Sequence, residues 1–213
     1  MRWLLELLFP SKCVLCRRVL RRGETDLCRS CRTQHEPWEK PKRKPQFLDS
    51  ITAVWYYEEN VRRAILRYKF YGARHLAGSF ARLLAMRLCE KDDAYDMLTW
   101  VPVSRLRRIT RGYDQVELLA KAVGRELNIE AQPTLKKIRH NRRQSSISSA
   151  AQRKANVLGA YRVISPEVLQ GKRILLLDDV LTTGATAGEC ARMLLTAGAK
   201  EVHCAVIATA RKE

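Results

Sequence analysis

The sequence predicts an α/β protein with a parallel sheet flanked by helices, preceded by a small cysteine-rich module. Ile174–Leu177 is continuously apolar and has the length of a strand, which is typical of a strand buried on both faces of a parallel sheet. A helical segment follows from about Ala187 to Ala197, and Gly198 stands where helix C-termini favour glycine. Val202–Ala208 is a second apolar strand. Two Cys-x-x-Cys pairs within the first 31 residues predict the separate N-terminal module.

Asp178 and Asp179 come directly after the first of these strands, and the loop Thr182–Thr186 opens the helix. The first N–H groups of a helix have no intrahelical partner, and together with the partial positive charge of the helix terminus they favour a phosphate. Gly184 lets the backbone approach a ligand closely, and the threonine hydroxyls add donors. Two carboxylates beside this loop can accept hydrogen bonds from a ribose 2′,3′-diol. The segment therefore predicts a ribose 5-phosphate site.

Other interpretations of this segment exist. An apolar strand followed by two acids also describes a Walker B segment, but the Gly-x-x-x-x-Gly-Lys-Ser/Thr loop that accompanies it is absent from this chain. The acids could instead be ordinary turn residues, with Thr182 or Thr183 as a plain helix N-cap.

The segment Ile174–Thr186 resembles, without a gap, the phosphoribosyl pyrophosphate (PRPP) motif of the type I phosphoribosyltransferases. That motif has four hydrophobic residues, two acids, an apolar pair and a Thr-Thr-Gly-Ser/Ala-Thr loop. The resemblance implies a type I phosphoribosyltransferase-like fold, with a Rossmann-like parallel sheet. It also implies that Asp178 and Asp179 are catalytic residues that hold the ribose hydroxyls, and that Mg²⁺ accompanies PRPP. The residues implied in binding the 5′-phosphate are Thr182, Thr183, Gly184, Ala185 and Thr186.

A second anion-binding segment is predicted after the strand Leu98–Val103, where an arginine-rich loop precedes a helix from Val116 to Leu127. The arginine fork matches the oxygens of a phosphate. In the phosphoribosyltransferases that the PRPP motif resembles, a loop after the first core strand holds the pyrophosphate. By that resemblance the role belongs to Ser104, Arg105 and Arg111.

The two cysteine pairs predict a structural zinc site. Eleven residues separate the pair Cys13 and Cys16 from the pair Cys28 and Cys31, and four thiolates close a tetrahedral Zn²⁺ site with no open position. A vestigial site or a redox pair is the alternative. A basic, proline-containing segment at 36–46 reads as a linker. We therefore expect a zinc-binding module with its linker at 1–46 and a phosphoribosyltransferase-like domain at 47–213.

The remaining patterns predict further elements. Ile51–Tyr57 is aromatic and β-branched and is expected to form a strand. A helix that begins at Asn60, its cap, is expected to end near Phe70. A second helix is expected from Leu76 to Cys89, with the Cys89 side chain in the core.

The net charge of +18 comes mostly from two blocks. Residues 1–50 carry 12 basic and 6 acidic side chains, and residues 101–160 carry 13 and 4. Such a surface attracts nucleic acid or phosphorylated small molecules, or is simply solvated. Within the second block, residues 144–149 are rich in serine. They lie either in a loop that closes over PRPP, as in the related enzymes, or in an ordinary surface loop.

No apolar run reaches the length of about 20 residues that crosses a membrane. Residues 2–9 are too short for a signal peptide, and Glu6 interrupts them. We expect them to form a short amphipathic helix, and the protein to be cytoplasmic.

The order of the motifs resembles the competence protein F (ComF) family of bacteria. The motifs are the cysteine pairs, Val-Pro-Val at 101–103, Arg-Gly-Tyr-Asp-Gln at 111–115, Gln144 with Arg153-x-x-Asn156, and the PRPP segment. The resemblance implies a zinc-binding module on a type I phosphoribosyltransferase domain that acts in handling incoming DNA. The implied partners are single-stranded DNA and a DNA-uptake helicase or other competence proteins. Tyr113 and Asp114 stand where the family has Phe and Asn, and Asp114 adds a negative charge beside the predicted pyrophosphate loop.

Two functions follow from these observations. The first is binding of PRPP or a ribose 5-phosphate, with phosphoribosyl transfer if the chain is an enzyme. The second is a non-catalytic nucleic-acid-binding scaffold that keeps the fold and uses its basic blocks.

Overall fold

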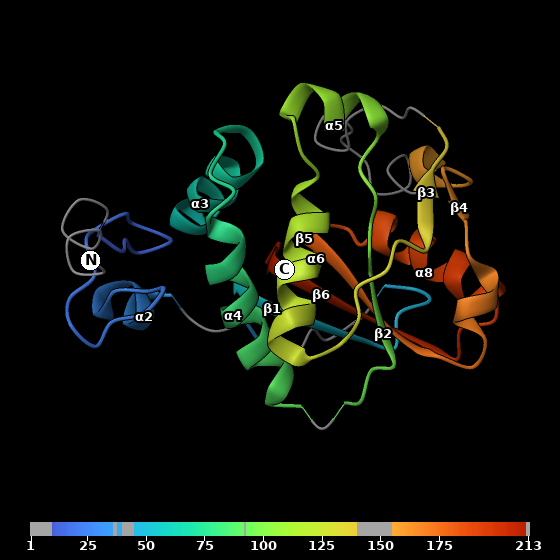
Figure 1. Ribbon diagram of the computed structural model, residues 1–213, viewed down its shortest axis with the longest axis horizontal. Coiled ribbons are helices and arrows are strands. Elements are labelled where there is room, and N and C mark those ends of the chain that lie inside the picture. Colours follow the sequence, from blue (N-terminus) through green and yellow to red (C-terminus); the bar gives the residue numbers. More distant parts are fainter. Residues whose placement is uncertain (1–9, 36–37, 40–44, 92, 140–154, 212–213) are drawn as a thin grey trace.

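The computed structural model describes residues 10–35, 38–39, 45–91, 93–139 and 155–211. A four-stranded sheet in the order β1-β6-β5-β2 lies at its centre (Figure 1). All pairings between these strands are parallel, which confirms the prediction of an α/β fold with a parallel sheet. The strands are β1 (Ser50–Tyr56), β2 (Met97–Trp100), β5 (Arg173–Leu181) and β6 (Glu201–Thr209).

Two strands differ most in length from the prediction, and β6 is longer than predicted by one residue at each end. β5 continues past the two acids to Leu181, because β6 pairs with it as far as the register of Leu181 with Thr209. β2 ends at Trp100 instead of Val103. The Val101 N–H still donates to the Leu177 carbonyl at 2.9 Å, but Pro102 has no N–H with which to continue the ladder.

Helices cover both faces of the sheet. On β5, Leu175 and Leu177 pack in one core cluster with α3, α4 and α6, whereas Ile174 and Leu176 pack on the opposite face with α8. This alternation is the period of two that a strand imposes on its side chains. The helices are α3 (Glu59–Phe70), α4 (Leu76–Cys89), α6 (Gln115–Leu127) and α8 (Ala185–Thr196).

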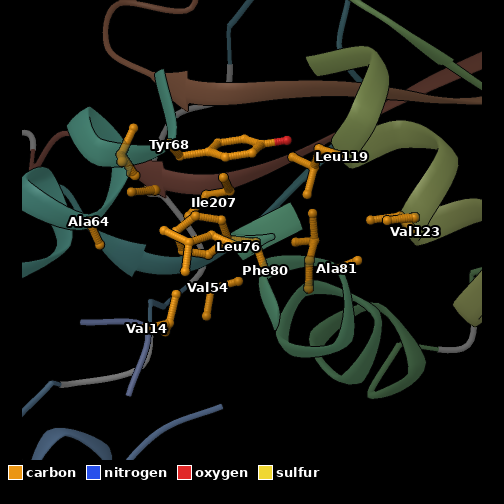
Figure 2. Packing of buried hydrophobic residues seen from close by; sticks show 14 of the residues in the cluster. Val14, Val54, Ala64, Tyr68, Leu76, Phe80, Ala81, Leu119, Val123 and Ile207 are labelled. Atoms are coloured by element: carbon orange, nitrogen blue, oxygen red, sulfur yellow. The ribbon is translucent and has the colours of Figure 1, made fainter. Parts of the chain in front are cut away.

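The core cluster on the α3–α4–α6 face also includes residues of the cysteine-rich module. Figure 2 shows Val14, from the first cysteine pair, near Val54 of β1. Tyr68 of α3 and Phe80 of α4 lie deeper in the same cluster, edge to face, with ring centroids 5.6 Å apart. Because the apolar side chains of the module are buried in this shared core, the module is packed against the sheet domain.

Shorter elements complete the described part of the chain. They are α2 (Arg29–Gln34), α5 (Arg105–Arg111), the 3₁₀ helix η2 (Pro166–Leu169), and the antiparallel pair β3 (Leu135–Lys137) and β4 (Tyr161–Val163). In Figure 1 α2 lies at one end of the molecule, beyond α3 and α4, and the β3–β4 pair lies at the other end.

The arginine-rich segment predicted as a loop forms the helix α5. Its apolar residues Leu106 and Ile109 are 60% and 68% exposed. Because neither residue is buried, α5 lacks the core-facing stripe of apolar residues from which a helix is predicted.

Two detailed predictions are wrong. Glu58, not Asn60, occupies the N-cap position of α3, and the Asn60 side chain instead accepts a hydrogen bond from Arg63. Cys89 is exposed rather than buried. The buried residues of α4 include Phe80, Leu84 and Leu88, at intervals of four, and Cys89 lies one residue further around the helix.

Some predictions concern other parts of the chain. The expected helix at 2–9 lies outside the described residues, as do most of the basic linker and the serine-rich segment at 144–149. In the part of the chain that the structure describes, no helix combines the length and apolar character needed to cross a membrane.

Candidate functional site

The end of β5 and the start of α8 form the predicted site. Asp178 and Asp179 lie within β5, and Gly184 occupies the N-cap position of α8 with φ 77°. Because Gly184 is the N-cap residue, the interpretation of Thr182 or Thr183 as a plain N-cap is wrong. The Thr183 Oγ1 instead accepts a hydrogen bond from the Ala185 N–H at 3.4 Å. The N-terminus of α8 thus follows, after a short loop, the strand that carries the two acids.

The two carboxylates lie on opposite faces of β5. Asp179 is 6% exposed and points toward α3 and α6. Its Oδ1 pairs with the Lys69 ammonium at 2.7 Å, and its Oδ2 accepts a hydrogen bond from the Gln115 Nε2 at 2.9 Å. Asp178 is half-buried on the α8 face. Burial raises the pKa of the Cys190 thiol on this face, and the negative charge of Asp178 raises it further.

Burial and the negative charge of Asp179 raise the pKa of Asp178, and the Lys69 ammonium opposes this shift. One oxygen of Asp178 accepts a hydrogen bond from the Asp179 N–H at 2.8 Å. Two neighbouring carboxylates in a poorly solvated place repel each other, so one of them is favoured in the protonated form. Lys69 is therefore part of the charge balance of the site.

The predicted pyrophosphate residues lie near this network. Arg111, at the end of α5, donates from Nη1 to the Gln115 Oε1 at 2.8 Å, so one amide connects it to Asp179. Its guanidinium also lies over the Phe70 ring, 4.6 Å from the centroid. Ser104 is buried just before α5, and Arg105 is exposed at its first turn. The structure thus joins Arg111 to the acids, and places Ser104 and Arg105 at the other end of the same short helix.

Asp114 acts as a helix cap. Its Oδ1 accepts hydrogen bonds from the N–H groups of Val116 and Glu117, at 2.9 and 3.1 Å, and the residue is 7% exposed. Burial raises the pKa of this carboxyl, while the backbone N–H groups oppose the shift. Its Oδ2 accepts a hydrogen bond from the Val103 N–H at 3.4 Å, so the carboxylate is held between the start of α6, where an acid is favourable, and the backbone before α5.

Sequence reasoning missed Lys69 and Gln115 as members of the site. Lys69 lies in the last turn of α3, where the spacing of apolar residues indicates only which face of the helix is buried. No sequence pattern near Lys69 connects it to Asp179. Gln115 could have been noticed, because it closes the Arg-Gly-Tyr-Asp-Gln segment that resembles the competence protein F family.

The linker reaches the loop that is predicted to bind the phosphate. A Cβ placed on Gly184 would lie 2.3 Å from Cγ of Pro45, and a Cβ on Gly188 would lie 3.1 Å from the Gln46 carbonyl oxygen. Gly184 is therefore required both by its positive φ and by the close approach of Pro45.

Replacing Gly184 by Ala is expected to destabilise the protein more than replacing Gly171 by Ala. Gly171 has a similar φ of 67° but nothing within 4 Å of its Cβ position, so its variant carries only the backbone strain, about 1 kcal/mol. The clash with Pro45 should add about 1–2 kcal/mol. Urea unfolding of both variants measures the difference, and equal losses would mean that Pro45 moves aside without cost.

The four cysteines of the N-terminal pairs form one cluster. Their Sγ atoms all lie within 4.8 Å of one another, and those of Cys16 and Cys28 are 3.7 Å apart. In a tetrahedral site with Zn–S bonds of about 2.3 Å, sulfur atoms are about 3.8 Å apart. The arrangement therefore fits the predicted four-thiolate zinc site, and Cys13, Cys16, Cys28 and Cys31 are its ligands.

α3 connects this centre with the acids. The Arg67 guanidinium donates to the carbonyls of Val14 and Leu15, which lie between the first two cysteines, at 2.7 and 3.0 Å. Two residues further along the helix, Lys69 pairs with Asp179. On α4, Arg82 forms a bidentate pair with Asp26 of the module. The zinc-binding module thus contacts the same helix that carries a cation of the candidate site.

Comparison with known proteins defines the class. The family profile described as phosphoribosyl transferase domain matches residues 117–213, and the one described as double zinc ribbon domain matches residues 4–42. Together with the parallel sheet and the cysteine cluster, these matches define a type I phosphoribosyltransferase-like fold with an N-terminal zinc ribbon. Within the described residues the ribbon holds a single four-cysteine cluster.

Three relatives show the family resemblance. Competence protein F of Haemophilus influenzae is 26% identical over 92% of this chain and 95% of its own length. DNA utilization protein YhgH of Escherichia coli K12 is 28% identical over 91% of this chain and 95% of its own. Competence protein ComFC of Streptococcus pneumoniae is 35% identical over 72% of this chain and 65% of its own. The resemblance to the competence protein F family is therefore confirmed.

Proposed function

We propose that this chain binds the ribose 5-phosphate part of PRPP at the carboxyl end of β5. The observation that carries the proposal is the meeting of the Asp178–Asp179 pair with the N-terminus of α8, which begins at Gly184. A phosphate at this helix terminus is favoured by the helix N–H groups and dipole. The ribose would lie across the end of the strand, where carboxylates on both faces can accept hydrogen bonds from its diol. The phosphoribosyl transferase profile spans both features and supports the proposal.

The donor set fits a magnesium ion that accompanies the ligand. Mg²⁺ sites usually combine one or two carboxylates with substrate phosphates, and Asp178 is a half-buried carboxylate beside the phosphate-binding loop. When bound, the ion would offset the charge of the diphosphate. If the site transfers phosphoribose, the bond from C1 to pyrophosphate breaks and a bond from C1 to the acceptor forms. The protein would then contribute positioning and charge stabilisation.

The names of the relatives support a role in DNA uptake or processing, because two of them are competence proteins and one is a DNA utilization protein. We propose a cytoplasmic location, since a reducing compartment keeps thiols available for zinc. None of the seven cysteines, all of which lie in the described ranges, forms a disulfide.

Nucleic-acid binding without catalysis is the second candidate function, and one surface favours it. A groove of about 1080 Å³ runs between the zinc-binding module and α3 and α4. Its lining includes the cations Lys12 and Arg17 and the aromatic residue Tyr71, which is 78% exposed. Cations that follow a phosphate backbone, combined with an aromatic ring on which a base can stack, are typical of single-strand binding.

Titration calorimetry tests the first candidate. Zinc-loaded protein is expected to bind PRPP with Mg²⁺ in a saturable, one-to-one manner, and ribose 5-phosphate as well. Ribose itself should bind at least about tenfold more weakly, because it forms no charge-assisted hydrogen bonds with the α8 terminus. Equal affinities for ribose and ribose 5-phosphate would contradict the phosphate site, and no binding of any of the three would favour the nucleic-acid-binding scaffold.

A further inference from the structure

Lys69 is placed in the candidate site by the ion pair of its ammonium with Asp179 at 2.7 Å. Its side chain is only 18% exposed, so the contact is largely shielded from water. An ammonium has three N–H donors, and one contact with a carboxylate oxygen leaves it able to contact a second anion. Lys69 therefore has the chemistry of a ligand-binding residue and not only of a counter-ion.

Lys69 and Arg111 lie on the same side of Asp179. Phe70 follows Lys69 in α3, and the Arg111 guanidinium lies over its ring. Arg111 also donates to Gln115, which in turn donates to Asp179. The end of α3 thus brings the Lys69 ammonium directly to this carboxylate, and the start of α6 connects Arg111, at the end of α5, to it through the Gln115 amide.

This side of the acids lies away from the phosphate-binding loop. Lys69 belongs to α3, which covers the face of the sheet to which Asp179 points, whereas the loop opens α8 on the other face. Arg111, at the end of α5, is connected to the Asp179 side through Gln115 of α6. In the ribose ring C1 and C4 flank the ring oxygen, and C4 carries the phosphorylated C5, so the C1 substituent and the 5-phosphate extend from opposite ends of the sugar. With the 5-phosphate at Gly184 and the diol at the acids, a substituent on C1 is directed away from the loop. Lys69, which pairs with Asp179, and Arg111, which donates to Gln115, are cations on that side.

The acids around Asp179 would repel an anionic ligand, so such a ligand needs a cation at this place. Besides burial, the negative charges of Asp179 and Asp114 raise the pKa of Asp178, and the Lys69 ammonium opposes them. Arg111 is connected to these acids through the Gln115 amide. Tyr68 and Tyr113 pack beside them as neutral groups, because burial raises the pKa of both phenols. A ligand with an anionic group at C1 would be repelled by the acids unless cations stood between them.

We propose that Lys69 is a substrate-binding residue that contacts the anionic group on C1 of the ribose 5-phosphate ligand, together with Arg111. The inference rests on the proposed function, because it takes the orientation of the ribose from it. It extends that function by assigning the recognition of the C1 diphosphate partly to α3, a helix outside both predicted anion-binding segments.

The test compares two ligands that differ only at C1. Lys69→Met keeps the length of the side chain without its charge, and it should weaken PRPP binding about tenfold or more. Binding of ribose 5-phosphate, which has no diphosphate, should change by less than about threefold. Lys121→Met, which removes an exposed cation paired with Glu117 on α6, is the matched control and should change neither affinity. Circular dichroism and zinc content verify folding, and Lys69→Gln, which can still donate to Asp179, replaces Lys69→Met if that variant does not fold.

Three outcomes are distinguishable. A selective loss of PRPP binding supports the inference. An equal loss for both ligands, or a gain for both, would overturn it, because Lys69 would then act only through Asp179. Failure of the wild-type protein to bind either ligand would overturn the proposed function itself.

Discussion

Replacing Asp178 and Asp179 together by Asn is expected to weaken binding of PRPP by about 100-fold or more. Each carboxylate can accept a charge-assisted hydrogen bond from the ribose diol, and such bonds contribute about 1.5–3 kcal/mol each. Binding of single-stranded DNA should change little, since the cationic groove between the zinc-binding module and α3–α4 does not include either acid. Calorimetry with PRPP and fluorescence anisotropy with an oligonucleotide measure the two affinities on the same preparations. Equal loss of both in a folded variant would mean that one site serves both ligands.

The single variants should affect stability in opposite directions. Asp179→Asn leaves the Lys69 ammonium without its carboxylate in a site where it is 18% exposed. Removing one partner of a buried pair costs about 3–5 kcal/mol, and the partial exposure of Lys69 places the expected loss at the lower end. Asp178→Asn removes a carboxylate that repels Asp179, so it should be neutral or stabilising at pH 7.

The pH dependence of unfolding follows from the same pair. Because the pKa of Asp178 is raised in the folded protein, folding favours its protonated form. Its contribution to the free energy of unfolding should therefore fall as the pH rises from the ordinary value for Asp, about 3.9, toward the raised value. Asp178→Asn removes this contribution and should flatten the curve over that range. A pH slope unchanged in the variant would contradict the shift.

Loss of a zinc ligand is expected to have the second large effect. Cys13→Ser should reduce the zinc content from one ion per chain to nearly none, because a four-thiolate site with one ligand missing is both open and weaker. Structural zinc contributes about 10–16 kcal/mol of apparent binding free energy in zinc-finger peptides, so the module should unfold. Val14 and Leu15 would then leave the shared core, and Arg67 would lose both of its carbonyl partners.

The consequences of zinc loss should reach α3. Metal analysis together with hydrogen exchange of α3 measures both effects, and we expect faster exchange there in Cys13→Ser. Cys89→Ser is the matched control, because Cys89 is exposed at the end of α4 and lies outside the cluster. Wild-type protein purified without chelators but lacking zinc would contradict the assignment, as would a fully loaded Cys13→Ser variant.

The local features of the fold could be predicted from the sequence. The strand before the acids, the helix that follows it and the cysteine cluster each depend on short-range patterns: an apolar run, a glycine at each end of a helix, and a fixed spacing of thiols. The PRPP segment gave the class of fold for the same reason. α5 could not be predicted, because Leu106 and Ile109 face solvent and leave no buried stripe.

The wider site depends on contacts between distant parts of the chain. Lys69 and Gln115 meet Asp179 only because α3 and α6 pack on one face of the sheet, and Arg111 joins them through Gln115. Nothing in the segment around Lys69 indicates its contact with Asp179, and the motif that contains Arg111 and Gln115 does not indicate which carboxylate they approach. The contact of Pro45 with Gly184 is of the same kind, since it joins the linker to a loop far along the sequence.

The most direct test of the proposed function is a crystal structure of the zinc-loaded protein with ribose 5-phosphate. We predict that the phosphate is bound by the backbone N–H groups between Thr182 and Thr186 at the start of α8, and that the 2′- and 3′-hydroxyls donate to Asp178 and Asp179. A ribose bound elsewhere, for example in the groove beside the zinc-binding module, would contradict the assignment of the strand end as the ligand site.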